Sequence, residues 1–183
     1  MCGIFGQINF NNKDVKKKDL ISMSEKMIHR GPDDIGIHLD KNIGIGMRRL
    51  SIIDLDGGHQ PISNETDDIY LVLNGEIYNY KELRLELEEL GHVFKTNTDV
   101  ESIIHLYEEY GLSCISKVNG MFSFALYDKR KEIIWIARDR LGIKPLYFFQ
   151  DSDTFLFSSD LVALNKITKQ EVEGPREIFT NVF

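Results

Sequence analysis

The chain opens with the stretch MCGIFG, residues 1–6, which combines a candidate nucleophile with the start of a first strand. Removal of Met1, which a small second residue favours, would leave Cys2 with a thiol and a free α-amine on one residue. The amine has a pKa of about 7.7–8.0 and the thiol one of about 8.5, so the amine can accept the thiol proton, directly or through a water. N-terminal threonine nucleophiles are activated in this way. Cys2 is therefore a candidate nucleophile that carries its own base.

The composition is that of an ordinary single domain with a substantial core. Of the 183 residues, 42% are hydrophobic and 28% are charged. The net charge of −7 argues against broad binding to nucleic acid or anionic membranes, because such binding needs a basic face. No apolar run reaches membrane length, and the N-terminus lacks the pattern of a signal peptide. We therefore expect a cytoplasmic protein that binds neither nucleic acid nor membranes.

Cysteine and histidine usage gives no sign of a disulfide framework or a metal centre. The two cysteines are Cys2 and Cys114, and the second is expected to be a small buried residue. The five histidines show no ligand spacing with cysteines or acids, so we expect no metal site. Neither a Walker A loop nor a GxGxxG motif after a strand occurs.

Hydrophobic periodicity predicts strands joined mostly by hairpins, with helices between some of them. A helix is expected over 14–29, where the helical spacing of Leu20, Met23 and Met27 indicates a core face. A second is expected from a capping box of Asn79 and Glu82 to Leu90, with Leu83, Leu87 and Leu90 on its inner face, and a third from about residue 99 to Tyr110. Strands are expected over 3–10, 35–39, 43–53, 69–73, 121–127, 132–138, 146–149 and 154–159. Successive hairpins with few βαβ crossovers favour an α+β domain with mostly antiparallel sheet.

Polar groups stand where several of these elements begin or end. Arg49 lies near the end of a strand, Asn74-Gly75-Glu76 follows another, and Asp99 opens a helix. A nucleophile that attacks an amide needs an oxyanion hole, which the Asn74 amide and the Gly75 N–H could supply. An arginine binds a carboxylate in bidentate fashion, and Glu76 or Asp99 could meet an ammonium group. Separately, each feature is more often a turn, a solvated arginine or a helix cap.

Eight ordered motifs together resemble the class II glutamine amidotransferase domain, in particular the glutaminase half of glutamine-hydrolysing asparagine synthetases. They are CGIFG (2–6), RGPD (30–33), RLSIID (49–54), QP (60–61), NGEIYN (74–79), TDVE (98–101), GMFSFA (120–125) and ARDRLGIKPLY (137–147). The resemblance covers about residues 2–164. It implies the N-terminal-nucleophile hydrolase fold, a four-layer αββα sandwich in which two antiparallel sheets lie between helical layers.

The resemblance also implies the catalytic roles. Cys2 would be the nucleophile, with its own amine as base, and Asn74 and the Gly75 N–H would form the oxyanion hole. Glutamine hydrolysis of this kind needs no cofactor and no metal.

The same resemblance implies how L-glutamine would be bound. Arg49 would hold its carboxylate, while Glu76 and Asp99 would hold its amino group beside the two oxyanion donors. Backbone groups expected to line the pocket belong to Leu50, Ile52 and Ile53.

Asparagine synthetases add a larger domain, which adenylates aspartate with ATP and Mg²⁺ through an SGGxDS loop, and that loop does not occur in this sequence. We expect residues 2–164 to be the glutaminase domain and 165–183 a C-terminal tail or truncated linker. The 183 residues would then be a fragment or a standalone subunit, with a synthetase domain or subunit as ammonia acceptor, and the resemblance admits a homodimer. The ammonia would amidate aspartate or another carboxylate. The alternative to a glutaminase is a catalytically silent interaction module that retains Met1.

Overall fold

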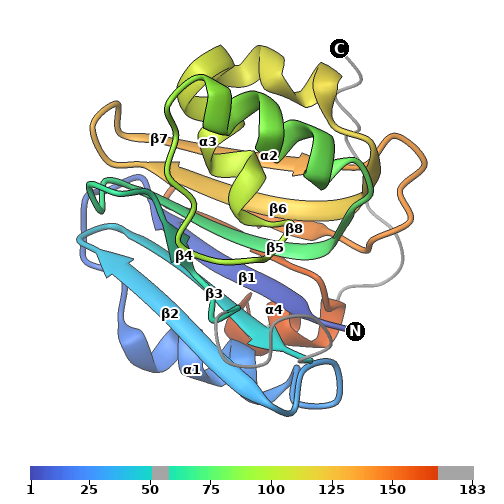
Figure 1. Ribbon diagram of the computed structural model, residues 1–183. Coiled ribbons are helices and arrows are strands. Elements are labelled where there is room, and N and C mark those ends of the chain that lie inside the picture. The colour runs from blue at the N-terminus through green and yellow to red at the C-terminus, as the bar shows by residue number, and fades with distance from the viewer. Residues whose placement is uncertain (51–57, 169–183) are drawn as a thin grey trace.

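The computed structural model describes residues 1–50 and 58–168, and its strands form two antiparallel sheets (Figure 1). The strands are β1 (Gly3–Asn9), β2 (Asp34–Asp40), β3 (Ile43–Arg49), β4 (Ile62–Ser63), β5 (Ile69–Ile77), β6 (Gly120–Asp128), β7 (Ile133–Arg138), β8 (Tyr147–Gln150) and β9 (Thr154–Ser158). The five-stranded sheet has the order β2-β3-β1-β9-β8, and the four-stranded sheet the order β4-β5-β6-β7.

Helices cover the outer face of each sheet, on opposite sides of the molecule (Figure 1). They are α1 (Lys17–Glu25), α2 (Tyr80–Glu89), α3 (Glu101–Tyr110), α4 (Leu161–Thr168) and the 3-10 helix η1 (Gly111–Lys117). Helices α1 and α4 pack on the five-stranded sheet, and α2 and α3 lie over the four-stranded sheet. The predicted four-layer αββα sandwich is confirmed.

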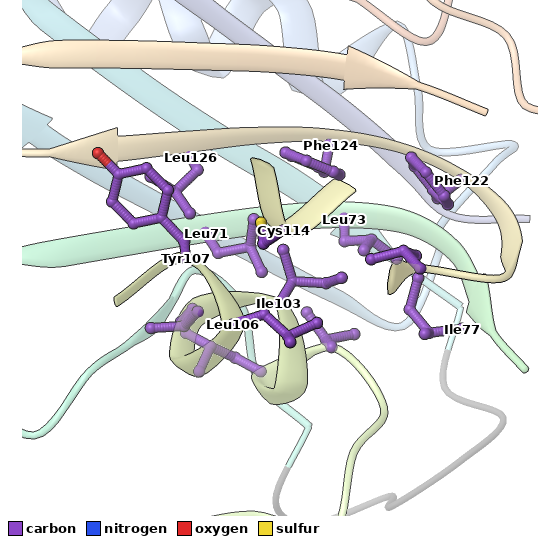
Figure 2. Packing of buried hydrophobic residues seen from close by; sticks show 14 of the residues in the cluster. Leu71, Leu73, Ile77, Ile103, Leu106, Tyr107, Cys114, Phe122, Phe124 and Leu126 are labelled. Carbon is purple, nitrogen blue, oxygen red and sulfur yellow. The ribbon is translucent and has the colours of Figure 1, made fainter. Parts of the chain in front are cut away.

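The alternation of side chains along β5 separates two layers of the core. Leu71 and Leu73 point toward α3, where they meet Ile103 and Leu106 (Figure 2). Val72, between them in sequence, points the other way and packs against the five-stranded sheet. Full burial of an aliphatic side chain of this size contributes about 1.5–3 kcal/mol to stability.

Strand β1 shows the same separation in the other sheet. Ile4 faces the space between the sheets, whereas Phe5 packs with Leu20, Met23 and Met27 beneath α1. The helical spacing of these three residues therefore marks a core face, as the sequence predicts. The layer that contains Ile4 and Val72 is the inter-sheet space.

Several local predictions were wrong. The Asn79 side chain does not cap α2: its Nδ2 donates to the Lys117 carbonyl at 2.9 Å, and its Oδ1 accepts from the Asn119 N–H at 3.0 Å. Leu90 is exposed, and the short helix α4 was not predicted at all.

The helices of the described ranges, 1–50 and 58–168, are short. The longest, α2 and α3, have 10 residues each, whereas a membrane-spanning helix needs about 20. None of them is long and apolar enough to cross a bilayer.

Candidate active site

Cys2 lies immediately before β1, at the border of the inter-sheet space. It packs against the cluster that contains Ile4, because residues two apart in an extended chain share a face. The Leu50 N–H donates to the Cys2 sulfur at 3.4 Å, and the thiol donates to the Leu50 carbonyl at 3.6 Å. The expected nucleophile therefore contacts a backbone that was expected to line its pocket.

Arg30 of the RGPD motif binds the backbone of Cys2. Arg30 donates from Nε to the Cys2 carbonyl at 3.2 Å. A Cβ on Gly3 would lie 2.3 Å from the Met27 side chain and 3.3 Å from that of Arg30, so the absence of a side chain allows this close packing. Met1 precedes Cys2 in the structure, so the Cys2 nitrogen is an amide there and becomes an α-amine only when Met1 is removed.

The register of β1 and β3 places Arg49 next to Cys2. Gly3 lies opposite Arg48 in this antiparallel pair, so residues 2 and 49 are the next positions along the two strands. Met47 points into the inter-sheet space, and Arg49 is in phase with it and 8% exposed. A guanidinium at this position is suited to bidentate binding of a carboxylate.

Asn74 reaches the same space from the opposite sheet. It is in phase with Val72, which packs in the inter-sheet cluster, and β5 contacts β1 and β3 across that space. The Asn74 side chain is 2% exposed, and its Nδ2 has no hydrogen-bond partner within residues 1–50 and 58–168. Buried polar groups nearly always have a partner, so this donor is available for an oxygen atom of a ligand.

Backbone pairing turns the N–H of Gly75 away from β6. Gly75 lies opposite Phe122, whose N–H donates to the Asp139 carboxylate at 3.3 Å and whose carbonyl accepts from the Asp139 N–H at 2.8 Å. Because Phe122 directs both groups away from β5, Gly75 and Phe122 form a non-hydrogen-bonded pair, and Gly75 likewise directs its N–H outward.

On the outer edge of β5, the backbone N–H groups on either side of Gly75 are hydrogen-bonded to side chains. The Leu73 N–H donates to Gln60 Oε1 at 2.7 Å, and the Ile77 N–H donates to Asp99 Oδ2 at 2.7 Å. The Gly75 N–H points toward the same edge between them. Adjacent residues thus present a side-chain donor from Asn74 and a backbone donor from Gly75.

The position of Asn74 and Gly75 corrects the expectation that they follow a strand. Both lie inside β5, which continues to Ile77. Gly75 has φ +156°, and a Cβ there would lie 2.1 Å from the Met121 carbonyl oxygen. The close approach of β6 therefore requires glycine at this position, rather than a turn.

Asp99 and Glu76 occupy different environments. Asp99 is 6% exposed just before α3, whereas Glu76 is exposed. Burial raises the pKa of Asp99 although the Ile77 N–H opposes this, and the nearby charge of Glu76 raises it further. A ligand ammonium would favour the ionised form of Asp99.

Two of the expected pocket residues, Ile52 and Ile53, lie outside the described residues. Gln60, by contrast, was missed by sequence reasoning except as part of the motif at 60–61. Its contact with Leu73 is formed across 13 positions of sequence, and spacing alone does not reveal it.

Comparison with known proteins identifies the class of this domain. The profile of the glutamine amidotransferase domain family matches residues 1–183, and the chain belongs to this family. It is 43% identical over 167 residues to asparagine synthetase [glutamine-hydrolyzing] 2 of Bacillus subtilis (strain 168). It is 42% identical over 193 residues to a putative asparagine synthetase [glutamine-hydrolyzing] 2 of Methanocaldococcus jannaschii. These matches cover 90% and 93% of this chain but 22% and 37% of the relatives, so the chain spans well under half of their length.

Solved structures share the fold. The allosteric regulatory enzyme of purine biosynthesis superimposes with a TM-score of 0.77, and glutamine phosphoribosylpyrophosphate amidotransferase from B. subtilis with 0.75. Each is 20% identical and covers 91% of this chain, which in turn covers 43% and 44% of those chains. The fold is therefore that of the N-terminal-nucleophile amidotransferases.

Proposed function

We propose that this domain hydrolyses the side-chain amide of L-glutamine to glutamate and ammonia through a glutamyl thioester on Cys2. The observation that carries the proposal is the buried Asn74 Nδ2, which has no partner in the described part of the chain and faces the layer in which Cys2 packs. Membership of the glutamine amidotransferase family supports the same substrate.

The reaction would begin after removal of Met1. The α-amine of Cys2 takes the thiol proton, and the thiolate attacks the side-chain carbonyl carbon of glutamine. Asn74 Nδ2 and the Gly75 N–H stabilise the resulting oxyanion. The carbon–nitrogen bond then breaks, and the proton held by the amine passes to the leaving nitrogen, which departs as ammonia.

Water completes the cycle. The α-amine accepts a proton from a water molecule as that water attacks the thioester carbon. The carbon–sulfur bond breaks, the thiolate recovers a proton, and glutamate leaves. Every step uses groups of this chain and one water, so the proposal includes no cofactor.

The polar groups around Cys2 would select the substrate. Arg49 would bind the α-carboxylate of glutamine, and Asp99 together with Glu76 would bind the α-ammonium group. The Leu50 backbone, already in contact with the Cys2 sulfur, would line the pocket. An amino acid with an amide side chain satisfies both charged ends and the oxyanion donors.

The ammonia would be used by a synthetase domain or subunit. The curated relatives are named as glutamine-hydrolysing asparagine synthetases and are much longer than this chain. We therefore propose that an ATP- and Mg²⁺-dependent synthetase partner amidates aspartate with ammonia released here. A different carboxylate acceptor would be served by the same glutaminase chemistry.

The first test is the intact mass of the purified protein before and after treatment with an electrophilic glutamine analogue. We expect loss of the Met1 mass and one adduct that maps to Cys2. Cys2→Ala should remove both the adduct and the release of glutamate, and sustained turnover by this variant would refute the mechanism.

Cys114→Ala is the matched control. Cys114 is fully buried, and burial raises the pKa of its thiol to about 12, so it should take no adduct and its removal should leave turnover unchanged. Retention of Met1, with no adduct on the unsubstituted chain after treatment, would instead favour the silent interaction module.

A further inference from the structure

Four potential metal ligands from three segments converge on the outer side of the four-stranded sheet. His105 and Glu108 lie on α3, His92 lies between α2 and α3, and Glu65 lies between β4 and β5. We propose that these four side chains form a binding site for one divalent transition-metal ion of the zinc class. The site is separate from the proposed glutaminase centre, and the proposal does not depend on that function.

The donor atoms are close to the spacing that a metal requires. His105 Nδ1 and Glu108 Oε2 form a hydrogen bond of 3.2 Å, which a bound metal ion would replace. His105 Nδ1 lies 3.9 Å from Glu65 Oε1, and His92 Nδ1 lies 3.8 Å from the same Glu108 oxygen. One donor atom each from Glu65, His92 and His105 lie within 4.8 Å of one another. Tetrahedral zinc with bonds of about 2.0–2.2 Å separates its ligand atoms by about 3.3–3.6 Å. Small side-chain movements would therefore complete the site.

The carboxylate of Glu101, which is not one of the four proposed ligands, orients His105. His105 is 1% exposed, and its Nε2 lies 3.5 Å from Glu101 Oε1. Glu101 is itself buried and accepts hydrogen bonds from the Lys95 and Thr96 N–H groups, each at 2.7 Å. A histidine that binds a metal through one nitrogen typically donates its other N–H to such a carboxylate. His105 Nε2, which has no hydrogen-bond partner among the described residues, is the atom that would make this bond.

Glu108 is also held in place. Asn64 donates from Nδ2 to Glu108 Oε1 at 2.8 Å, which leaves Oε2 directed toward the two histidines. Carboxylate and imidazole together suit zinc better than calcium or magnesium, which prefer oxygen ligands alone.

The charge around the two imidazoles favours a cation. The carboxylates within ion-pair distance of them belong to Glu65, Glu101, Glu108 and Glu109. The nearby Lys95 ammonium donates to the Asn64 carbonyl at 2.8 Å. A divalent ion would offset part of the carboxylate charge at the centre of the group.

The proposed ligand set explains why sequence spacing predicts no metal site. Only His105 and Glu108 have helical i, i+3 spacing, and the other two ligands join them through packing. Four protein ligands leave no open position, which is typical of a structural site. The ion would fasten the β4–β5 turn and the α2–α3 segment to α3, on the side of the sheet opposite the inter-sheet space.

Titration of the full chain with Zn²⁺ or Co²⁺ after EDTA treatment tests the proposal. A Cys2→Ala background removes the thiol, which is itself a zinc ligand. We expect saturable binding of one Zn²⁺, a tetrahedral visible spectrum with Co²⁺, and a higher unfolding temperature in the presence of Zn²⁺. Absence of saturable binding would overturn the proposal.

Two ligand variants locate the ion without disturbing the fully buried His105. His92→Gln and Glu65→Gln should each weaken zinc binding by more than the roughly 10–100-fold that loss of an outer-shell partner causes. His29→Gln is the matched control, because His29 is an exposed histidine paired with the Asp160 carboxylate at 3.2 Å. Zinc binding equal in all three variants would place the ion elsewhere and refute this assignment.

A parallel measurement separates this proposal from the glutaminase mechanism. With Cys2 present, the glutamine hydrolysis rate of His92→Gln should match that of the unmodified chain. Loss of zinc binding without loss of hydrolysis would support a structural ion, and loss of hydrolysis with intact folding would contradict the structural role.

Discussion

Asn74 and Asp99 are polar side chains buried at the expense of stability. A buried donor without a partner costs about 1–3 kcal/mol, and a desolvated carboxyl has a raised pKa for the same physical reason. Within residues 1–50 and 58–168, Asn74 Nδ2 shows the first condition, and Asp99 shows the second. A ligand that satisfies both groups is the simplest physical account of their burial.

Asn74→Ala should lower kcat by about 10²–10³, the typical effect of removing one oxyanion donor. Stability should be unchanged or higher, because the substitution removes an unpaired buried group. Steady-state kinetics and denaturant unfolding of the same samples check both expectations.

Asn64→Ala is a control for which we expect the opposite effects on kcat and stability. Asn64 is equally buried, but it bonds to Thr66, Asp68 and Glu108, so its loss should lower stability and leave kcat of the folded protein unchanged. A decrease of less than tenfold in kcat for Asn74→Ala would exclude Asn74 from the oxyanion hole.

Asp99→Asn should lower kcat/KM for glutamine by about 10–150-fold, which corresponds to loss of a charged hydrogen bond of about 1.5–3 kcal/mol. The pH dependence has a definite sign. Because the folded-state pKa of Asp99 is raised, the folded chain binds this proton more tightly than the unfolded chain does.

The contribution of Asp99 to stability is consequently present at acid pH and is lost as pH rises through its raised pKa. Relative to Asp99→Asn, the unmodified chain should lose stability from acid to neutral pH, while its KM falls as Asp99 ionises. Thermal unfolding and kinetics across this range measure both effects, and parallel pH profiles of the two proteins would contradict the assignment.

Strand β5 contributes to the core, to the candidate site and to the edge of its sheet. One face packs beneath α3, the other reaches the inter-sheet space through Asn74, and the outer edge presents the Gly75 N–H between two capped groups. The caps prevent β5 from exposing a row of open backbone donors, a common hazard of edge strands.

Gln60→Ala should destabilise the domain by about 1–3 kcal/mol, because it leaves the buried Leu73 N–H without its 2.7 Å partner. It should also lower kcat, since Leu73 is two positions from Gly75 on the same edge. Gln7→Ala is the control: Gln7 is a buried glutamine on β1 that donates to Asn9 at 2.8 Å, so its loss should affect stability alone. Equal kcat values for the two variants would show that the Gln60 cap does not position the site.

The candidate site exists only when the two sheets pack face to face. Cys2 directly precedes β1 and Arg49 ends β3, both in the five-stranded sheet, whereas Asn74 lies on β5 of the four-stranded one. Phe157 is fully buried between the sheets. Stability and assembly of the candidate site therefore depend on the same interface between the sheets.

Phe157→Ala should reduce the free energy of unfolding by about 3–5 kcal/mol through loss of contacts and a residual cavity. Trp135, the single tryptophan, lies on β7 in the other sheet, so its fluorescence and the far-UV signal should report one shared transition. Phe10→Ala is the control, because Phe10 is 49% exposed and should change stability by less than about 0.5 kcal/mol. Separate transitions for the two probes would show that the layers unfold independently.

Much of the architecture was predictable because it follows local periodicity. The spacing of Leu20, Met23 and Met27 marked a buried helix face, and the hairpins after residue 120 marked antiparallel strands. The order of the eight motifs indicated the amidotransferase fold. Asn79 and Leu90 were misread, because the contacts that decide their roles come from distant segments.

The α+β class and the family follow from the amino-acid sequence alone, as do the candidate residues Cys2, Arg49, Asn74, Gly75 and Asp99. These are properties of local pattern and motif order. The folded structure was needed to show that Asn74 and Gly75 lie within a strand and that Gln60 caps the edge of that strand. It was also needed to show that Glu65, His92, His105 and Glu108 meet. The physical reason is that these contacts join side chains and backbone groups far apart along the chain, and packing of sheets and helices alone brings them together.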